Sequence, residues 1–142
     1  MAIILQRIST AINASFLTSA TAKSVTTRFI VADDNFVSST GTSWNILKEL
    51  RFVRNSEDFN SNTLLIKTET MSLQGTTNIG VFLNSEALPR KILSTVGTTF
   101  ELLQGTTYIG DLSDGVHSIQ INSRNLDNGT SYQRLVELWE KI

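Results

Sequence analysis

The octapeptide LQGTTNIG at residues 73–80 returns as LQGTTYIG at residues 103–110. Each copy places a glycine beside Gln and ahead of two threonines, which is typical of a turn or bulge leading into an extended segment. The Ile-Gly pair that ends each copy lets another backbone come close. The copies lie about 30 residues apart, or two strands with their turns, so successive hairpins are predicted here. Two copies do not predict a stacked-repeat fold, because such folds need three or more units. Duplication and chance resemblance both stay open as the origin of the two copies.

The composition points to one domain without special chemistry. The chain has 142 residues, a formal net charge of −1 and no cysteine. This length can bury a core without disulfide or metal support, and the missing cysteine excludes thiol catalysis and thiolate metal sites. The near-zero charge, with scattered Lys and Arg, gives no electrostatic reason to expect a nucleic-acid partner. No secretion signal and no stretch of membrane-spanning length is recognised.

Polar residues of a particular kind fill much of the remaining sequence. About a third of the chain is Ser, Thr or Asn, and its one proline is Pro89. This mixture is typical of exposed sheet faces and Asx turns rather than of helices or charged disorder.

The N-terminal residues differ from the rest. Apolar residues at helical spacing predict a short amphipathic helix over residues 3–17, or alternatively an arm that docks elsewhere or pairs with the sheet. We divide the chain into an N-terminal arm, residues 1–23, and a β-sandwich domain, residues 24–142. The apolar stripe of the arm consists of Ile4, Ile8, Ile12 and Phe16. Because one small domain would leave this stripe in water, we expect it to be buried against the sandwich or another subunit of a homo-oligomer.

From residue 24 the apolar period changes to two, which predicts short strands between Gly-, Asn- and Asp-containing turns. The predicted strands cover residues 25–32, 63–73, 78–83, 90–96, 98–103, 106–112 and 116–122. A further extended start at 36–37 is interrupted by a loop at 38–42. Residues 46–53 fit a strand, although a helix over 43–51 is possible, and the C-terminal segment after residue 130 also fits either element. Strands at this spacing predict a sandwich or a barrel.

Five segments together resemble a known type of module. They are WNILKELRF at 44–52, NTLLIKTE at 62–69, GVFLNSE at 80–86, DGVHSIQIN at 114–122 and NGTSYQRLVEL at 128–138. Their order resembles small jelly-roll β-sandwich modules of bacteriophage and archaeal-virus structural and tail proteins, and similar modules occur beside carbohydrate-binding domains. The resemblance implies an antiparallel jelly roll whose last segment is a strand. It also implies a location in the virion or outside the cell, with other virion proteins or a host glycan as partners. The modules do not predict the N-terminal arm.

The residues give little sign of catalysis. His117, the only histidine, shares a strand side with Ile119 and Ile121, so a partly buried sheet residue fits better than a catalytic base. No Gly-x-Ser-x-Gly elbow occurs. The acidic residues fall in apparent turns, where Asp commonly accepts backbone hydrogen bonds; they are Asp33, Asp34, Glu57, Asp58, Asp111, Asp114 and Asp127. The loops at 111–115 and 127–129 lack the spacing of an EF-hand. We therefore expect no catalytic residue, no metal site and no cofactor.

Aromatic side chains are the remaining candidates for ligand contact, because a flat ring matches the apolar face of a pyranose. The possible glycan contacts are Trp44, Tyr108, Tyr132 and Trp139. Each also fits a core or edge position, with Trp44 favouring the core and Trp139 an exposed site. The predicted function is a non-enzymatic viral structural or virion-associated protein that acts by self-assembly or host-surface recognition. The alternative is a carbohydrate-binding β-sandwich module.

Overall fold

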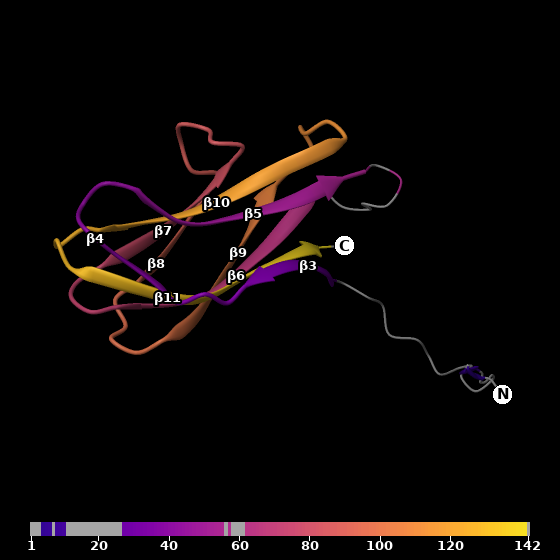
Figure 1. Ribbon diagram of the computed structural model, residues 1–142, viewed down its shortest axis with the longest axis horizontal. Helices are drawn as coiled ribbons and strands as arrows, with labels where there is room; N and C mark the ends of the chain where they lie inside the picture. The colour runs from indigo at the N-terminus through magenta and orange to yellow at the C-terminus, as the bar shows by residue number, and fades with distance from the viewer. Residues whose placement is uncertain (1–3, 7, 11–26, 56, 58–61, 142) are drawn as a thin grey trace.

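The computed structural model describes residues 4–6, 8–10, 27–55, 57 and 62–141. Within this part of the chain every regular element is a strand, and the strands from Thr27 onward form two antiparallel sheets. The sheets face each other, with β5 and β10 in one layer and β3 and β11 in the other (Figure 1). The predicted all-β, antiparallel jelly-roll β-sandwich is confirmed. In the same described ranges, no helix is long and apolar enough to cross a membrane.

The two sheets contain five and four strands. The five-stranded sheet consists of β3 (Thr27–Asp33), β4 (Val37–Thr40), β6 (Thr63–Ser72), β9 (Glu101–Tyr108) and β11 (Thr130–Lys141). Its order is β3-β11-β6-β9, and β4 also pairs with β11. The four-stranded sheet consists of β5 (Asn45–Arg54), β7 (Thr77–Leu83), β8 (Lys91–Thr95) and β10 (Gly115–Asn125), in the order β5-β10-β7-β8.

The connections between strands are those of a jelly roll. Of the sandwich strands described, only β7 and β8 pair with a neighbour in sequence. The other successive strands either lie in different sheets or, like β3 and β4, pair side by side with β11. The expectation of successive hairpins around the octapeptides is therefore confirmed for β7 and β8 and wrong for the other successive strands. Strand β6 pairs with β9 and not with β7. Strands β6 and β7 lie in different sheets, and their inward side chains meet in the core that both sheets share.

The interior has an apolar part and a polar part. The apolar core comprises Leu50, Phe52, Leu64, Ile66, Ile79, Val81, Leu83, Ile109, Ile119, Ile121, Val136 and Leu138. Further along β6 and β11 the buried inward positions carry polar side chains instead, among them Thr68, Thr70 and Gln133. The Gln133 amide donates to the Thr68 hydroxyl at 2.9 Å, and the Thr68 and Thr70 hydroxyls lie 3.1 Å apart. Hydrogen bonds between these buried groups offset part of their desolvation cost.

The two octapeptides form different local structures. In the first copy Gly75 has a φ of 71° in the turn between β6 and β7, and the strand begins at Thr77. In the second copy Gly105 lies inside β9 and the turn follows at the other end of the peptide. Both isoleucines, Ile79 and Ile109, are fully buried. The shared feature is thus a buried Ile rather than a shared turn.

Several predicted boundaries are corrected by the strand pairing. Residues 45–54 form β5, so the helical alternative for 43–51 is wrong; alternate residues from Lys48 to Arg54 are buried, as in a strand with one face on the core. β4 occupies part of the predicted loop at 38–42 because it pairs with β11. The strands predicted at 98–103 and 106–112 are one strand, β9. The C-terminal segment forms β11, as the preferred alternative predicted.

Only part of the predicted arm is described. Strands β1 (Ile4–Gln6) and β2 (Ile8–Thr10) pair antiparallel, so the helical alternative does not hold for these residues. Ile12 and Phe16 lie outside the described residues. The burial of the apolar stripe, and the homo-oligomer it would serve, stay predictions.

Candidate functional site

The five-stranded sheet presents one face away from the sandwich interior, and we call this the outer face. Strands β11, β6 and β9 are neighbours, so their outward residues align in rows across the sheet. Two of these rows are Trp139–Leu65–Thr106 and Glu137–Lys67–Gln104. Strand β3 adds Phe29 beside Trp139. The result is a surface on which aromatic, aliphatic and charged side chains alternate.

A first aromatic cluster lies at the β3 side of the outer face. The rings of Phe29 and Trp139 meet edge to face with centroids 5.3 Å apart. The Lys67 ammonium lies 4.5 Å from the Trp139 ring, and the indole N–H donates to Glu137 at 2.9 Å. Phe29 is 51% exposed. These contacts hold the half-buried indole in one orientation while a large apolar ring stays open to a ligand.

A second aromatic cluster joins Tyr132 of β11 to the residues that precede β4 and β9. Phe36 contacts Tyr132 and Phe100, with ring centroids 5.7 and 6.3 Å away. The Arg134 guanidinium lies 4.2 Å from the Phe100 ring and its Nε donates to Glu69 at 2.6 Å. Phe36 is 63% exposed although it packs on two rings. This cluster therefore also offers open aromatic surface, framed by an ion pair.

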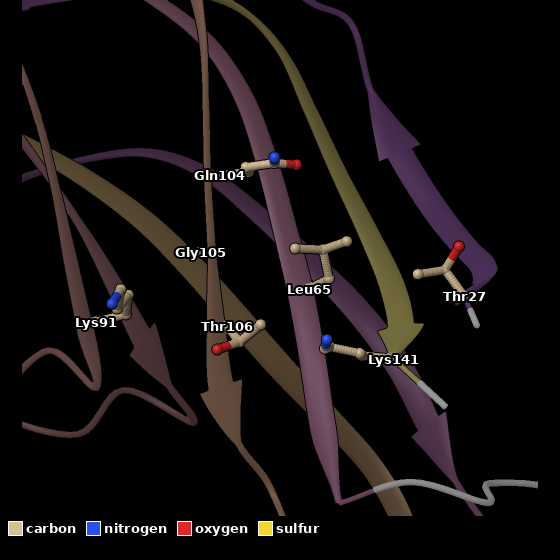
Figure 2. A pocket seen from close by; sticks show the side chains of 7 residues that line it. All are labelled: Thr27, Leu65, Lys91, Gln104, Gly105, Thr106 and Lys141. Atoms are coloured by element: carbon tan, nitrogen blue, oxygen red, sulfur yellow. The ribbon is translucent and has the colours of Figure 1, made fainter.

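A pocket of about 410 Å³ opens beside the first cluster. Leu65 of β6 lies between Gln104 and Thr106 of β9 and Lys141 of β11, with Thr27 at the start of β3 on the far side (Figure 2). Lys91 reaches the pocket from β8, in the opposite sheet. Such a volume is within the range of small-ligand sites.

Three of the four predicted glycan contacts lie on strands of the five-stranded sheet, and Trp44 does not. Tyr132 and Trp139 belong to the two clusters of the outer face. Tyr108 ends β9 and is 59% exposed, and its ring lies over Gly110, where a Cβ would collide with it. Trp44 precedes β5 in the other sheet, where it packs edge to face on Phe82 with centroids 5.4 Å apart.

The position of Trp44 also explains a glycine of the first octapeptide. A Cβ on Gly80 would lie 2.9 Å from the Trp44 ring and 2.8 Å from Phe82. The Arg124 guanidinium stacks on the indole at 4.4 Å. The expected close approach to the Ile-Gly pair is thus made by aromatic rings rather than by another backbone.

Sequence reasoning did not select Phe29, Phe36 or Phe100, which complete the two clusters. Period two shows that residues alternate between faces, but it does not show which face is covered. Phe36 reaches Tyr132 only because β4 and β11 pair, although they are about 90 residues apart in the chain. No local signal in the sequence reports this pairing.

His117 is held by two hydrogen bonds. Its Nδ1 lies 2.9 Å from the Asn84 amide nitrogen, and its Nε2 lies 2.8 Å from the Ser113 carbonyl oxygen. Asn84 is itself fixed because its side-chain oxygen accepts from the Ser118 N–H at 2.9 Å. Both ring nitrogens of His117 are therefore engaged, one with the loop that follows β7 and the other with the loop that precedes β10.

The acidic residues of the turns are engaged in different ways. Asp127 accepts from the Thr76 N–H at 3.0 Å, so it binds the backbone of the β6–β7 turn and not that of its own turn. Asp111 instead pairs with Arg90, which also binds Glu86; the nearest distances are 2.8 and 2.6 Å. These hydrogen bonds from Arg90 hold the pKa of Glu86 and the pKa of Asp111 below their usual values, and the carboxylates raise the pKa of Arg90. In the described part of the chain, no group of three or more His, Cys, Asp or Glu side chains is placed to hold a metal ion.

Comparison with known proteins gives only distant likenesses. No family model and no curated protein matches the chain. Among solved structures, a carbohydrate-binding module, CBM36, in complex with calcium and xylotriose is similar over 80% of this chain and 99% of its own, with 11% identity and a TM-score of 0.48. A CBM4 structure covers 76% of this chain and 74% of its own, with 11% identity and a TM-score of 0.46. The module BiXyn10A CBM1 covers 78% and 97%, with 14% identity and a TM-score of 0.43. Likenesses this distant support no conclusion about a ligand.

Proposed function

We propose that the protein is a non-enzymatic binding module that holds a glycan on the outer face of its five-stranded sheet. The observation that supports this most strongly is the pair of open aromatic clusters on that face, around Trp139 and Tyr132. Sugar rings have an apolar face that stacks on an aromatic ring and hydroxyl groups that hydrogen-bond to neighbouring polar side chains. The outer face supplies both kinds of group.

The spacing of the clusters favours an extended ligand. Trp139 and Tyr132 are on the same strand, and at about 3.3 Å per residue they lie roughly 20 Å apart. A single sugar could not contact both rings, whereas a chain of several sugars could. The side chains between them, Glu137, Lys67 and Glu69, can donate to or accept from hydroxyl groups.

Catalysis has less support in the same region. The side chains that could act as acids or bases on the outer face, Glu69 and Glu137, already bind Arg134 and the Trp139 indole. His117 lies on β10 of the other sheet, with both ring nitrogens engaged. We therefore assign the face to binding rather than to bond cleavage.

Assembly into a virion stays a prediction from the sequence resemblance. The competing role for the same aromatic face is contact with a second copy, since exposed apolar patches often mark interfaces. Glycan binding and self-assembly through this face can be told apart by measuring glycan binding at high protein concentration. A face covered by another copy would not bind glycan under that condition. The solution mass is therefore measured together with binding.

The test is a glycan array followed by titration calorimetry with the best ligand. Phe29→Ala and Trp139→Ala should each weaken binding about tenfold or more, since a buried stacking contact contributes roughly 1–3 kcal/mol. Ile46→Ala is the matched control, because Ile46 is a similarly exposed apolar residue, 61%, on the opposite sheet. Circular dichroism confirms that each variant is folded. Absence of glycan binding, or equal losses in Ile46→Ala and Trp139→Ala, would overturn the proposal.

A further inference from the structure

The pocket beside Trp139 is bordered by lysines whose charge is not balanced locally. Lys91 and Lys141 line it and both are exposed, and Lys67 lies next to it over the indole. Within the described residues, no carboxylate lies within 4.0 Å of any of these three ammonium groups. The pocket therefore presents a net positive charge on an otherwise nearly neutral protein.

The carboxylates around this pocket are bound elsewhere. Glu140, next to Lys141 in the chain, is fully buried and pairs with Arg28 at 2.6 Å. Glu137 accepts the indole N–H of Trp139. Glu140 is neutralised by Arg28, whereas Glu137 can still accept from Lys67, which lies opposite it on β6. The charges that stay unbalanced are those of Lys91 and Lys141.

The fold places the lysines at opposite ends of the pocket. Lys141 lies on β11 and Gln104 and Thr106 on β9, two strand spacings away, or about 10 Å. Lys91 comes from the opposite sheet, and its stem passes Gly105, where a Cβ would lie 2.9 Å from the Lys91 Cε. Figure 2 shows Lys91 on one side of β9 and Leu65 and Lys141 on the other. The missing side chain at residue 105 therefore leaves room for a lysine at this edge.

The remaining lining groups suit a sugar that carries an acid. Leu65 offers an apolar surface, and Gln104 and Thr106 offer hydrogen-bond donors and acceptors between the two lysines. We propose that the glycan bound on the outer face is acidic, with uronic acid carboxylates that pair with Lys91 and Lys141. This inference rests on the proposed glycan-binding function and specifies its ligand class.

The experiment compares each acidic glycan with its own neutral form. Glucuronoxylan, polygalacturonate, alginate and hyaluronan are titrated beside the same polymers after their carboxyl groups have been reduced to alcohols. Within each pair the linkages are the same, and the charged carboxylate of one form is replaced by a neutral primary alcohol in the other. We expect at least one acidic polymer to bind ten times or more tightly than its reduced form, with an affinity that falls as salt rises.

Charge-removing variants locate the effect. Lys91→Gln and Lys141→Gln should each weaken binding of the acidic polymer about fivefold, the upper range for an exposed ion pair, and should weaken binding of the reduced polymer clearly less. Arg51→Gln removes an exposed positive charge from the opposite sheet and should have no effect. Circular dichroism again confirms folding.

The possible outcomes are distinct. If acidic and reduced polymers bind equally, or if the lysine variants behave like Arg51→Gln, the acidic-ligand inference is wrong while glycan binding stands. If no glycan binds in either form here or on the array, the proposed function itself is wrong and the inference fails with it.

Discussion

Gly75 and Gly105 occupy the same place in two nearly identical octapeptides, yet their surroundings differ. Gly75 has a φ of 71°, and a Cβ there would collide with the Asp127 carboxylate. Gly105 is in an extended strand, where a Cβ would lie 2.8 Å from the Leu93 Cδ2 and 2.9 Å from the Lys91 Cε. Both atoms near Gly105 are far ends of flexible side chains. Backbone conformation and a close carboxylate therefore require glycine at residue 75, whereas only movable side chains limit residue 105.

We predict that Gly75→Ala costs about 2–3 kcal/mol of unfolding free energy, because Ala disfavours this φ and the Asp127 side chain must move. Gly105→Ala should cost about 1 kcal/mol or less, since Leu93 and Lys91 can shift. Urea unfolding of both variants beside the wild-type protein measures the difference. Equal losses would show that the backbone conformations of the two glycines do not decide the cost of an added methyl group.

At the scale of elements, Arg90 joins two loops that no strand pairing connects. It follows β7 and binds Glu86 in its own loop and Asp111 in the loop between β9 and β10. It also donates to the Tyr108 carbonyl at 2.9 Å, at the end of β9. One side chain thus ties the β7–β8 connection to the β9–β10 connection at one end of the sandwich.

This arrangement predicts an acid-dependent stability. Arg90 lowers the pKa of Glu86 and the pKa of Asp111 in the folded state. The stability that Arg90 contributes through these two carboxylates is therefore complete above their unfolded pKa values, about 4, and is lost as the pH falls through the lowered values. Arg90→Met should therefore lower the melting temperature at pH 7 by a few degrees, and the difference from wild type should shrink below about pH 4.

The matched control removes the titrating groups instead. In Glu86→Gln with Asp111→Asn, the Arg90→Met substitution should change the melting temperature by a similar small amount at pH 7 and at pH 3. If the melting temperatures of the wild-type protein and Arg90→Met differ by the same amount throughout the acid range, Arg90 acts by packing alone.

The elements themselves could largely be predicted from the sequence, and their pairing could not. Period two in residues 63–73 and 116–122 identified β6 and β10, because each buries one face in a shared core. The pairing of β6 with β9, and of β4 with β11, depends on contacts between segments far apart in the chain. For the same reason Tyr132 and Trp139 could be selected as candidate rings, whereas their partners Phe36 and Phe29 could not.

At the scale of the whole molecule, the two outer faces of the sandwich differ in how exposed their aromatic rings are. The ring of Trp44 on the four-stranded sheet is packed on Phe82 and under Arg124. On the five-stranded sheet, Phe29, Phe36 and Tyr108 are each more than half exposed. Both sheets carry aromatic residues on their outer faces. The proposed binding surface differs from the other face because its aromatic rings are exposed.

The most direct test of this account is an ¹⁵N–¹H correlation spectrum of the folded protein during titration with the best glycan from the array. If the outer face binds the glycan, the largest shift changes should fall on amides of β3, β6, β9 and β11, together with the indole N–H of Trp139, which lies on the outer face. The amides of β5, β7 and β10 and the indole N–H of Trp44 should move little. Shift changes centred on the four-stranded sheet, or saturating changes near Trp44 with none near Trp139, would contradict the central claim.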